Sequence, residues 1–320
     1  MSKFLSITVV VLMLGCGGGA SDLQKEEAAS PPDGVTLTPH DERVEVAVDG
    51  RPFTAFHYEE KWDKPFLYPL TTASGTVISR GYPIEPRAGE TADHAWHRGI
   101  WYGHGDINGQ DFWREKGREV TSILVPQAKP AVSGDALSVE LAMQTPTDGT
   151  IGSIEKSFTF SGARNLRVID ATIRIRADEG VALRFGDTDD GGFGIRLSDA
   201  FREDNGGVTA NAEGLETSEN IWGKASRWTN YSAEVGGKAV GVAIFDHPSN
   251  LRYPTTWHAR GYSLNAANPF ATRSFTGDPS ADGSHTIPEG ESLTFRYRVV
   301  IHEGFPGEVN VEELYRDYVQ

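Results

Sequence analysis

The sequence predicts an all-β fold: one large antiparallel β-sandwich, of the supersandwich or jelly-roll kind, with long loops and a short C-terminal helix. Alternating apolar and polar residues recur along the chain, whereas only its last residues carry the signals of a helix. The 36 glycines and 17 prolines among 320 residues supply the turns that many strands require. No break in composition divides residues 35 to 320, so we expect them to form a single domain.

The first sixteen residues predict a lipoprotein signal peptide. Lys3 precedes an apolar run from Phe4 to Leu14, which is too short to cross a bilayer and is typical of an export signal. The pair Gly15-Cys16 resembles a bacterial lipobox, in which the cysteine is lipidated and becomes N-terminal, although the two positions before the pair depart from the usual pattern. A chance cysteine in a cleaved leader is the alternative.

Cys16 is the only cysteine, so the folded domain has no disulfide, zinc–thiolate site or cysteine nucleophile. Gly17, rather than an aspartate, follows it, and this favours sorting to the outer membrane. Residues 17 to 34 are small, acidic and proline-bearing, which suits a flexible linker. We therefore expect a cell-envelope protein at the periplasmic face of the outer membrane, touching the membrane only through its lipid anchor.

Strand periodicity marks the middle of the chain. Residues 137 to 143 alternate apolar with mostly polar side chains, and residues 154 to 160 do the same, except that Lys156 stands on the apolar side. In residues 166 to 176 the alternation changes phase at positions 168 and 169, which predicts a β-bulge.

Two further strands and a helix complete the predicted elements. Residues 240 to 245 are mostly apolar, as in a central strand, and residues 293 to 301 alternate over a long strand. We expect His302, which follows it on the polar side, to be exposed. The helix is predicted over Val311 to Tyr318, where Asn310 can cap the first turn and a glutamate stands three residues later, in capping-box spacing.

Charge and missing motifs exclude several functions. The net charge of −15 disfavours nucleic acid as a partner, because nothing would neutralise its phosphates. The sequence has no serine-nucleophile elbow, phosphate-binding glycine loop, dinucleotide fingerprint or HExxH motif. Acyl transfer by serine and nucleotide chemistry are therefore not expected.

Residues 93 to 113 hold the densest group of candidate functional residues, with three histidines, three tryptophans and four glycines. His94-x-x-His97 together with His104 is compatible with an open catalytic zinc site, or with another first-row divalent metal. In the alternative interpretation, these histidines hydrogen-bond the loop backbone and hold its shape.

Without a metal, the same segment favours a saccharide site. Trp101 offers a flat face for sugar C–H groups, and His97 and His104 can transfer protons near neutral pH. Three neighbouring side chains offer donors and acceptors for sugar hydroxyls: His94, Asn108 and Asp111.

Two other segments are expected to form the opposite walls of that site. In residues 184 to 196, Asp187 is expected to point inward as an orienting or basic carboxylate, with a calcium loop or a solvated turn as alternatives. In residues 245 to 270, His258 is a further candidate for proton transfer or metal ligation and Trp257 a second stacking surface. His247 and Asn268 are candidate substrate-binding residues there, unless the asparagines only cap backbone turns.

Three runs carry a family resemblance: H-A-W-H-R-G-I-W-Y-G-H-G-D-I-N-G-Q-D-F-W, F-G-D-T-D-D-G-G-F-G-I-R and V-A-I-F-D-H-P-S-N-L-R-Y-P-T-T-W-H-A-R-G-Y. Over about residues 40 to 305 the chain resembles the soluble bacterial family catalogued as "methane oxygenase PmoA", a domain of unknown function. The catalogue name is no guide to activity, because the PmoA subunit of particulate methane monooxygenase spans the membrane several times and this chain has no apolar stretch of that length after residue 16. The family is often found in bacteria rich in polysaccharide-degrading genes, which implies work on carbohydrates.

A second, weaker resemblance is to galactose-mutarotase-like supersandwiches. It rests on size, all-β character, paired histidines and the ending I-P-E-G-E-S-L-T-F-R-Y-R. The glutamate base that mutarotases carry shortly before the final strand has no counterpart in residues 277 to 288, so an aldose 1-epimerase is not expected.

These observations lead to one hypothesis with two alternatives. We expect a cell-envelope lipoprotein that acts on a glycoside or modified sugar by general acid/base catalysis, through hydrolysis, elimination or epimerisation, with no cofactor required. A non-catalytic glycan-binding lipoprotein would use the same loops. A metal-dependent oxygenase or hydrolase would instead use the histidine cluster and a first-row divalent metal.

Overall fold

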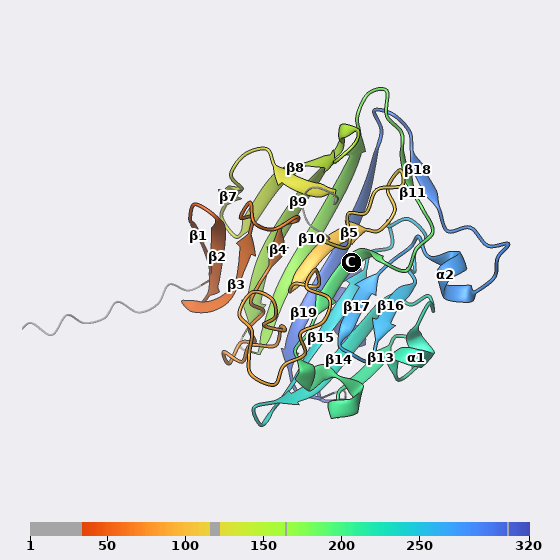
Figure 1. Ribbon diagram of the computed structural model, residues 1–320. Helices are drawn as coiled ribbons and strands as arrows, with labels where there is room; N and C mark the ends of the chain where they lie inside the picture. Colours follow the sequence, from red (N-terminus) through yellow and green to blue (C-terminus); the bar gives the residue numbers. More distant parts are fainter. Residues whose placement is uncertain (1–33, 116–121, 164, 306) are drawn as a thin grey trace, which may run out of the picture. The chain divides into compact units, whose positions relative to one another are not determined.

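Two large antiparallel β-sheets face each other in the computed structural model, which describes residues 34–115, 122–163, 165–305 and 307–320 (Figure 1). The eight-stranded sheet has the order β1 (Val35–Pro39), β2 (Arg43–Val48), β3 (Arg51–His57), β4 (Phe66–Leu67), β5 (Ile100–His104), β12 (Gly191–Arg196), β17 (Leu264–Ala267) and β16 (Trp257–Arg260). The predicted signal peptide, Cys16 and the linker up to residue 33 lie outside the described residues.

The nine-stranded sheet has the order β13 (Val208–Asn211), β14 (Trp228–Val235), β15 (Lys238–Asp246), β19 (Ser292–Glu303), β10 (Leu166–Ala177), β9 (Gly149–Ala163), β8 (Ala136–Thr145) and β6 (Ile123–Pro126), with β7 (Ala131–Ser133) paired to β8. A small sheet pairs β11 (Leu183–Phe185) with β18 (His285–Ile287). The short helices are η1 (Asp199–Phe201), η2 (Glu203–Asn205), α1 (Ser218–Ile221) and α2 (Thr272–Thr276), and α3 (Val311–Val319) ends the chain. The predicted all-β sandwich with a C-terminal helix is confirmed.

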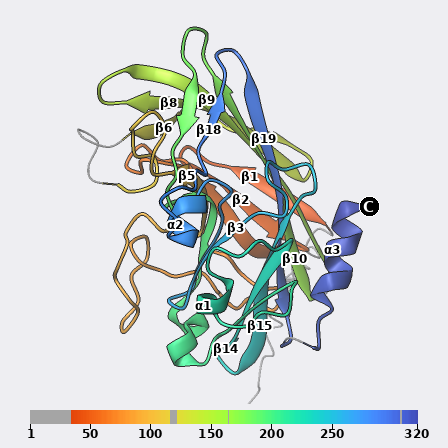
Figure 2. The same ribbon diagram turned by 90° about the vertical axis from the view of Figure 1, so that its right-hand side faces the viewer.

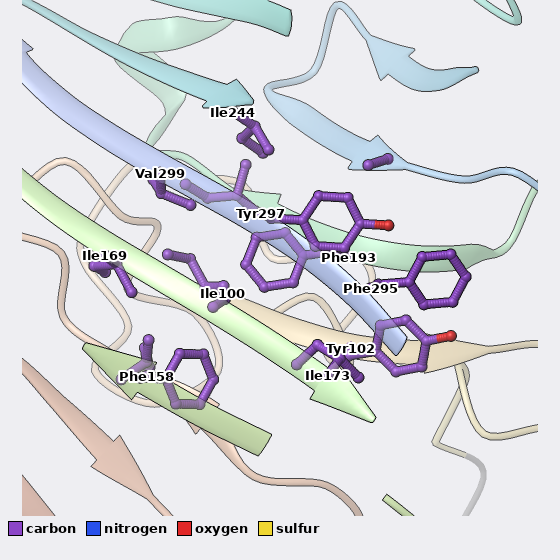
Figure 3. Close-up of a cluster of buried hydrophobic side chains, with 14 of the residues drawn as sticks. Ile100, Tyr102, Phe158, Ile169, Ile173, Phe193, Ile244, Phe295, Tyr297 and Val299 are labelled. Carbon is purple, nitrogen blue, oxygen red and sulfur yellow. The ribbon is translucent and has the colours of Figure 1, made fainter. Parts of the chain in front are cut away.

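The main core lies between the two sheets. Side chains that alternate along β19 point into it, as predicted, and Tyr297 of β19 stacks on Phe193 of β12 with ring centroids 4.8 Å apart (Figure 3). Phe295 meets Tyr102 of β5 at 6.3 Å in the same layer. The period of two therefore separates a buried face from an outer face on both sheets.

Helix α3 lies beside β10, on the side of the nine-stranded sheet that faces away from the main core, and explains why one prediction was wrong (Figure 2). Val311 and Tyr315 pack there with Phe245 of β15, and Leu166 and Val168 of β10 join them. The register of β10 is regular throughout, so the predicted β-bulge is absent. The apparent phase change arose because this end of β10 is covered on both faces.

The prediction that His302 is exposed was also wrong, because its side chain is fully buried. Its Nε2 lies 2.9 Å from Oδ1 of Asn230 on β14. Gly241 on the neighbouring strand leaves the room for the imidazole, because a Cβ there would stand 2.3 Å from the ring. Burial lowers the pKa of His302 to about 4.

Lys156 of β9, the exception to the predicted alternation, is buried on the apolar side of the strand. Its Nζ donates to the carbonyl oxygen of Pro65 at 3.2 Å, and burial lowers its pKa to about 7. The unfolded chain keeps this proton up to the ordinary lysine value of 10.5, whereas the folded chain releases it above about pH 7. The free energy of unfolding should therefore rise with pH across that window.

Replacing Lys156 with methionine is expected to raise the free energy of unfolding near pH 7 by about 1–3 kcal/mol, because a buried charge is exchanged for an apolar side chain of similar length. Urea unfolding at about pH 7 and about pH 9 measures the effect, which should shrink at the higher pH. Lys129→Met, at an exposed lysine, is the control. Equal stabilities of wild type and Lys156→Met at both pH values would contradict the assignment.

The helices in the described part of the chain include none with the length and hydrophobicity needed to span a membrane.

Candidate functional site

The candidate site lies on the face of the eight-stranded sheet that points away from the nine-stranded sheet, which we call the outer face. Strand pairing places Trp101 (β5), Gly194 (β12), Ala266 (β17) and His258 (β16) in one row across it. The two small residues in the middle of the row leave room above the sheet. A Cβ on Gly194 would stand 2.9 Å from the Trp101 indole, so that ring lies over β12.

A stack of four rings fills the centre of the outer face. His94 lies between Tyr262 and His97, with centroids 5.5 Å and 5.0 Å away and planes within 6° of parallel. His97 stacks in turn on Trp101 at 5.1 Å. A turn in which His97 N donates to His94 O at 3.0 Å brings the two imidazoles together, although residues three apart on a strand would point to opposite faces.

Beneath this stack, one carboxylate joins two buried arginines. Arg80 and Arg196 are at most 1% exposed, and both guanidinium groups pair with Asp93, that of Arg196 at 2.8 Å. Arg80 also donates to the carbonyl oxygens of His94 and His97. Asp93 Oδ1 lies 3.3 Å from Nδ1 of His94, so the same carboxylate also orients that imidazole.

His94 and His97 differ sharply in access to solvent. The His94 side chain is 39% exposed, whereas His97 is 2% exposed. Burial lowers the pKa of His97 well below its usual value, and the nearby Arg196 adds to the effect. His97 is therefore a neutral, buried member of the stack, and His94 is the histidine that a ligand can reach.

His258 shares the outer face but is engaged at both ring nitrogens. Its Nδ1 lies 2.5 Å from the carbonyl oxygen of Asp189, and Nε of Arg260 donates to its Nε2 at 3.1 Å. Burial, followed by the charge of Arg260, lowers its pKa to about 4. Nδ2 of Asn268 donates to the same Asp189 oxygen at 3.0 Å. His258 and Asn268 thus position the loop that carries Asp189.

His104 is not brought to this face. It points to the core side of β5, where it packs on Phe185 and Phe270, and its Nε2 lies 2.9 Å from Gly186 O. Burial lowers its pKa to about 4. The structure therefore matches the alternative interpretation for His104, in which the imidazole holds the backbone in place.

Asp187 is also engaged elsewhere. Its carboxylate accepts hydrogen bonds from the backbone N–H groups of Arg273, Ser274 and Gly283 at 2.6–3.1 Å, and so fixes the start of α2. The Asp187 carboxylate is therefore engaged in holding the backbone and does not point into the outer-face site.

The remaining predicted site residues hold the core or the loop backbone in place, or lie away from the outer face. Trp257 is fully buried on the core side and donates from Nε1 to Ser226 O at 2.8 Å, so it is no stacking surface. Asn108, at a φ of +55°, pairs with β11 through Arg184 N. Asp111 accepts from the backbone N–H groups of Trp113 and Arg114. His247 packs on Tyr318 of α3, at the other sheet.

Sequence reasoning missed several residues of the outer face. Asp190 pairs with Arg114, and its side chain is 18% exposed. Burial raises the pKa of the Asp190 carboxyl, although Arg114 opposes this, and the charge of His94 also acts on it. Arg260 lies 3.7 Å over the ring of half-buried Trp222. The aspartate run D-T-D-D was the available signal, but nothing in it distinguished Asp190 from Asp187.

The predicted metal site finds no support in the donor geometry. Across residues 34–115, 122–163, 165–305 and 307–320, no group of three or more His, Cys, Asp or Glu side chains is placed to hold an ion. His94 and His97 stack face to face instead of converging through their nitrogens.

A protein-family model identifies the family of this chain. A model described as "Family of unknown function (DUF6807)" matches residues 43–316. The chain belongs to this family. The DUF6807 match covers both sheets from β2 onward, and no match carried the expected name methane oxygenase PmoA. No curated protein matches the sequence.

Solved structures similar to this DUF6807 chain include galactose-mutarotase-like proteins, as the weaker resemblance suggested. One from Clostridium acetobutylicum has 9% identity and a TM-score of 0.39, over 84% of this chain and 98% of that one. One from Lactobacillus acidophilus has 10% identity and a TM-score of 0.37, over 84% and 97%. A heparan sulfate lyase from Pedobacter heparinus has 7% identity and a TM-score of 0.38, over 84% and 35%. Similarity at this level says nothing about the chemistry of the site.

Proposed function

We propose that the outer face around His94 is the active site of an enzyme that acts on a saccharide by general acid/base catalysis. The observation that carries the proposal is the exposed His94 imidazole, whose Nδ1 lies 3.3 Å from Oδ1 of Asp93. A solvent-accessible histidine that a carboxylate holds in place can transfer a proton to or from a ligand.

We assign His94 and Asp190 complementary roles. His94, oriented by the Asp93 carboxylate, acts as the general acid. Asp190, held beside Arg114 as a carboxylate with a raised pKa, acts as the general base. Half-buried Trp96 meets the His94 ring edge to face at 5.4 Å and offers an apolar surface for sugar C–H groups.

The assay is turnover of glycosides, 3-keto-glycosides and free reducing sugars, followed by product chromatography and polarimetry. Turnover of at least one substrate, lost in His94→Gln, supports the proposal. Binding of a sugar at this site without turnover of any would favour the glycan-binding alternative. Full activity that depends on an added first-row metal, and survives His94→Gln, would favour the metal-dependent alternative.

Asp190→Asn is expected to remove the acidic limb of the pH–rate profile. A general base must be deprotonated, so the rate should rise as pH rises through the raised pKa of Asp190. The measurement is kcat across pH for wild type, Asp190→Asn and the exposed control Asp278→Asn. An unchanged acidic limb in Asp190→Asn would remove Asp190 from the mechanism.

We also propose that residues 35–320 act as one domain behind the linker, anchored through lipidated Cys16 at the periplasmic face of the outer membrane. The lipobox-like pair at residues 15 and 16 supports this. Labelled palmitate should enter the wild-type protein and not Cys16→Ala. Equal labelling of the two would refute the anchor.

A further inference from the structure

A second cleft lies on the outer face, at the other end of the same sheet. It has a volume of about 490 Å³, which is within the range of small-molecule sites. Strands β1, β2 and β3 and the segment after β4 form it, whereas the His94 site is built on β5, β12, β17 and β16 (Figure 1). None of its lining residues belongs to the proposed catalytic group.

The floor of this cleft is polar and fixed. Nδ1 of His57 lies 3.1 Å from Glu59 Oε1, and its Nε2 lies 2.9 Å from Tyr68 O. Both ring nitrogens are engaged, so His57 shapes the floor and is not placed for proton transfer.

The walls add neutral donors and carboxylate acceptors. The Tyr68 hydroxyl donates to Glu85 Oε2 at 3.1 Å, and burial raises the pKa of Tyr68 to about 12, so it stays neutral. Arg43 is neutralised by Glu45, through two hydrogen bonds of 2.9 and 2.7 Å to one carboxylate oxygen. Arg87, which also acts on the Tyr68 hydroxyl, offsets the charge of Glu85, so the charges around the cleft are balanced and suit a neutral ligand.

The ligand class follows from this combination. Carboxylate oxygens that accept hydrogen bonds suit ligands rich in hydroxyl groups, and Pro52 and Pro69 in the lining offer apolar contact for C–H groups. We propose that the cleft is a binding site for a neutral saccharide, separate from the His94 site.

Isothermal titration calorimetry of the full-length protein with neutral hexasaccharides tests this, using maltohexaose, cellohexaose, xylohexaose and mannohexaose. At least one should bind, and the double variant Glu45→Gln with Glu85→Gln should weaken it about tenfold or more. Glutamine keeps the shape and one acceptor oxygen, and unchanged circular dichroism and thermal midpoint confirm folding. Glu234→Gln, at an exposed glutamate on β14, is the matched control and should bind as wild type does.

His94→Gln separates this inference from the proposed function. Binding that persists in His94→Gln and is lost in the double variant supports the cleft. Binding lost only in His94→Gln places the sugar at the other site and overturns the cleft while leaving the proposed function standing. Absence of binding by all four probes, or binding of oligogalacturonate as tight as that of the best neutral probe, would also overturn it.

Discussion

Replacing Asp93 with alanine is expected to lower the free energy of unfolding by about 3–5 kcal/mol, the cost of breaking a buried ion pair by removing one partner. Asp93 is the carboxylate that both buried arginines, Arg80 and Arg196, share. Without it, two guanidinium groups with almost no solvent exposure would face each other, and burial already lowers the pKa of Arg196 to about 10. Urea unfolding near neutral pH measures the change.

Asp204→Ala is the matched control, because Asp204 pairs with Arg202 through two hydrogen bonds at the surface. An exposed pair of this kind contributes little to stability, so the control should stay close to wild type. If Asp93→Ala changes the free energy of unfolding no more than Asp204→Ala does, the Asp93 carboxylate does not stabilise the two buried arginines.

Replacing His94 with glutamine is expected to lower kcat by about 100- to 10,000-fold, the usual contribution of a general acid or base. Glutamine retains hydrogen bonding and much of the side-chain volume but cannot carry a proton at neutral pH. KM should therefore change much less than kcat. Steady-state kinetics on the identified saccharide provide both constants.

His247→Gln is the control for that change. His247 is a partly exposed histidine beside α3, outside both sites on the outer face. Its replacement should leave kcat and KM near the wild-type values. Equal loss in the two variants would show a general effect of histidine removal and remove His94 from the mechanism.

Much of the fold could be predicted from the sequence because side-chain alternation follows directly from strand geometry. Alternation predicted the strands around residues 137–143, 154–160 and 293–301. The C-terminal helix was predicted from the capping-box spacing of Asn310 and Glu313. Side-chain alternation is lost where both faces of a strand are covered. At β10 the helix α3 buries Leu166 and Val168, and the pattern then mimics a bulge.

The site was predicted less completely, for a physical reason. The sequence predicts that segment 93–113 is part of the site, but its periodicity does not tell which face of β5 each side chain takes. Trp101 points to the outer face and His104 to the core. Exposure also decides between His94 and His97, and it depends on Tyr262 and Arg196, which are distant in sequence.

The most direct test of this account compares His94→Gln with His104→Gln on one saccharide substrate. His104 is buried in the core, so its replacement should lower stability while kcat of the folded fraction stays within about threefold of wild type. His94→Gln should remain as stable as wild type and lose at least about 100-fold in kcat. The reverse pattern, with kcat lost in folded His104→Gln and kept in His94→Gln, would contradict the placement of the active site on the outer face.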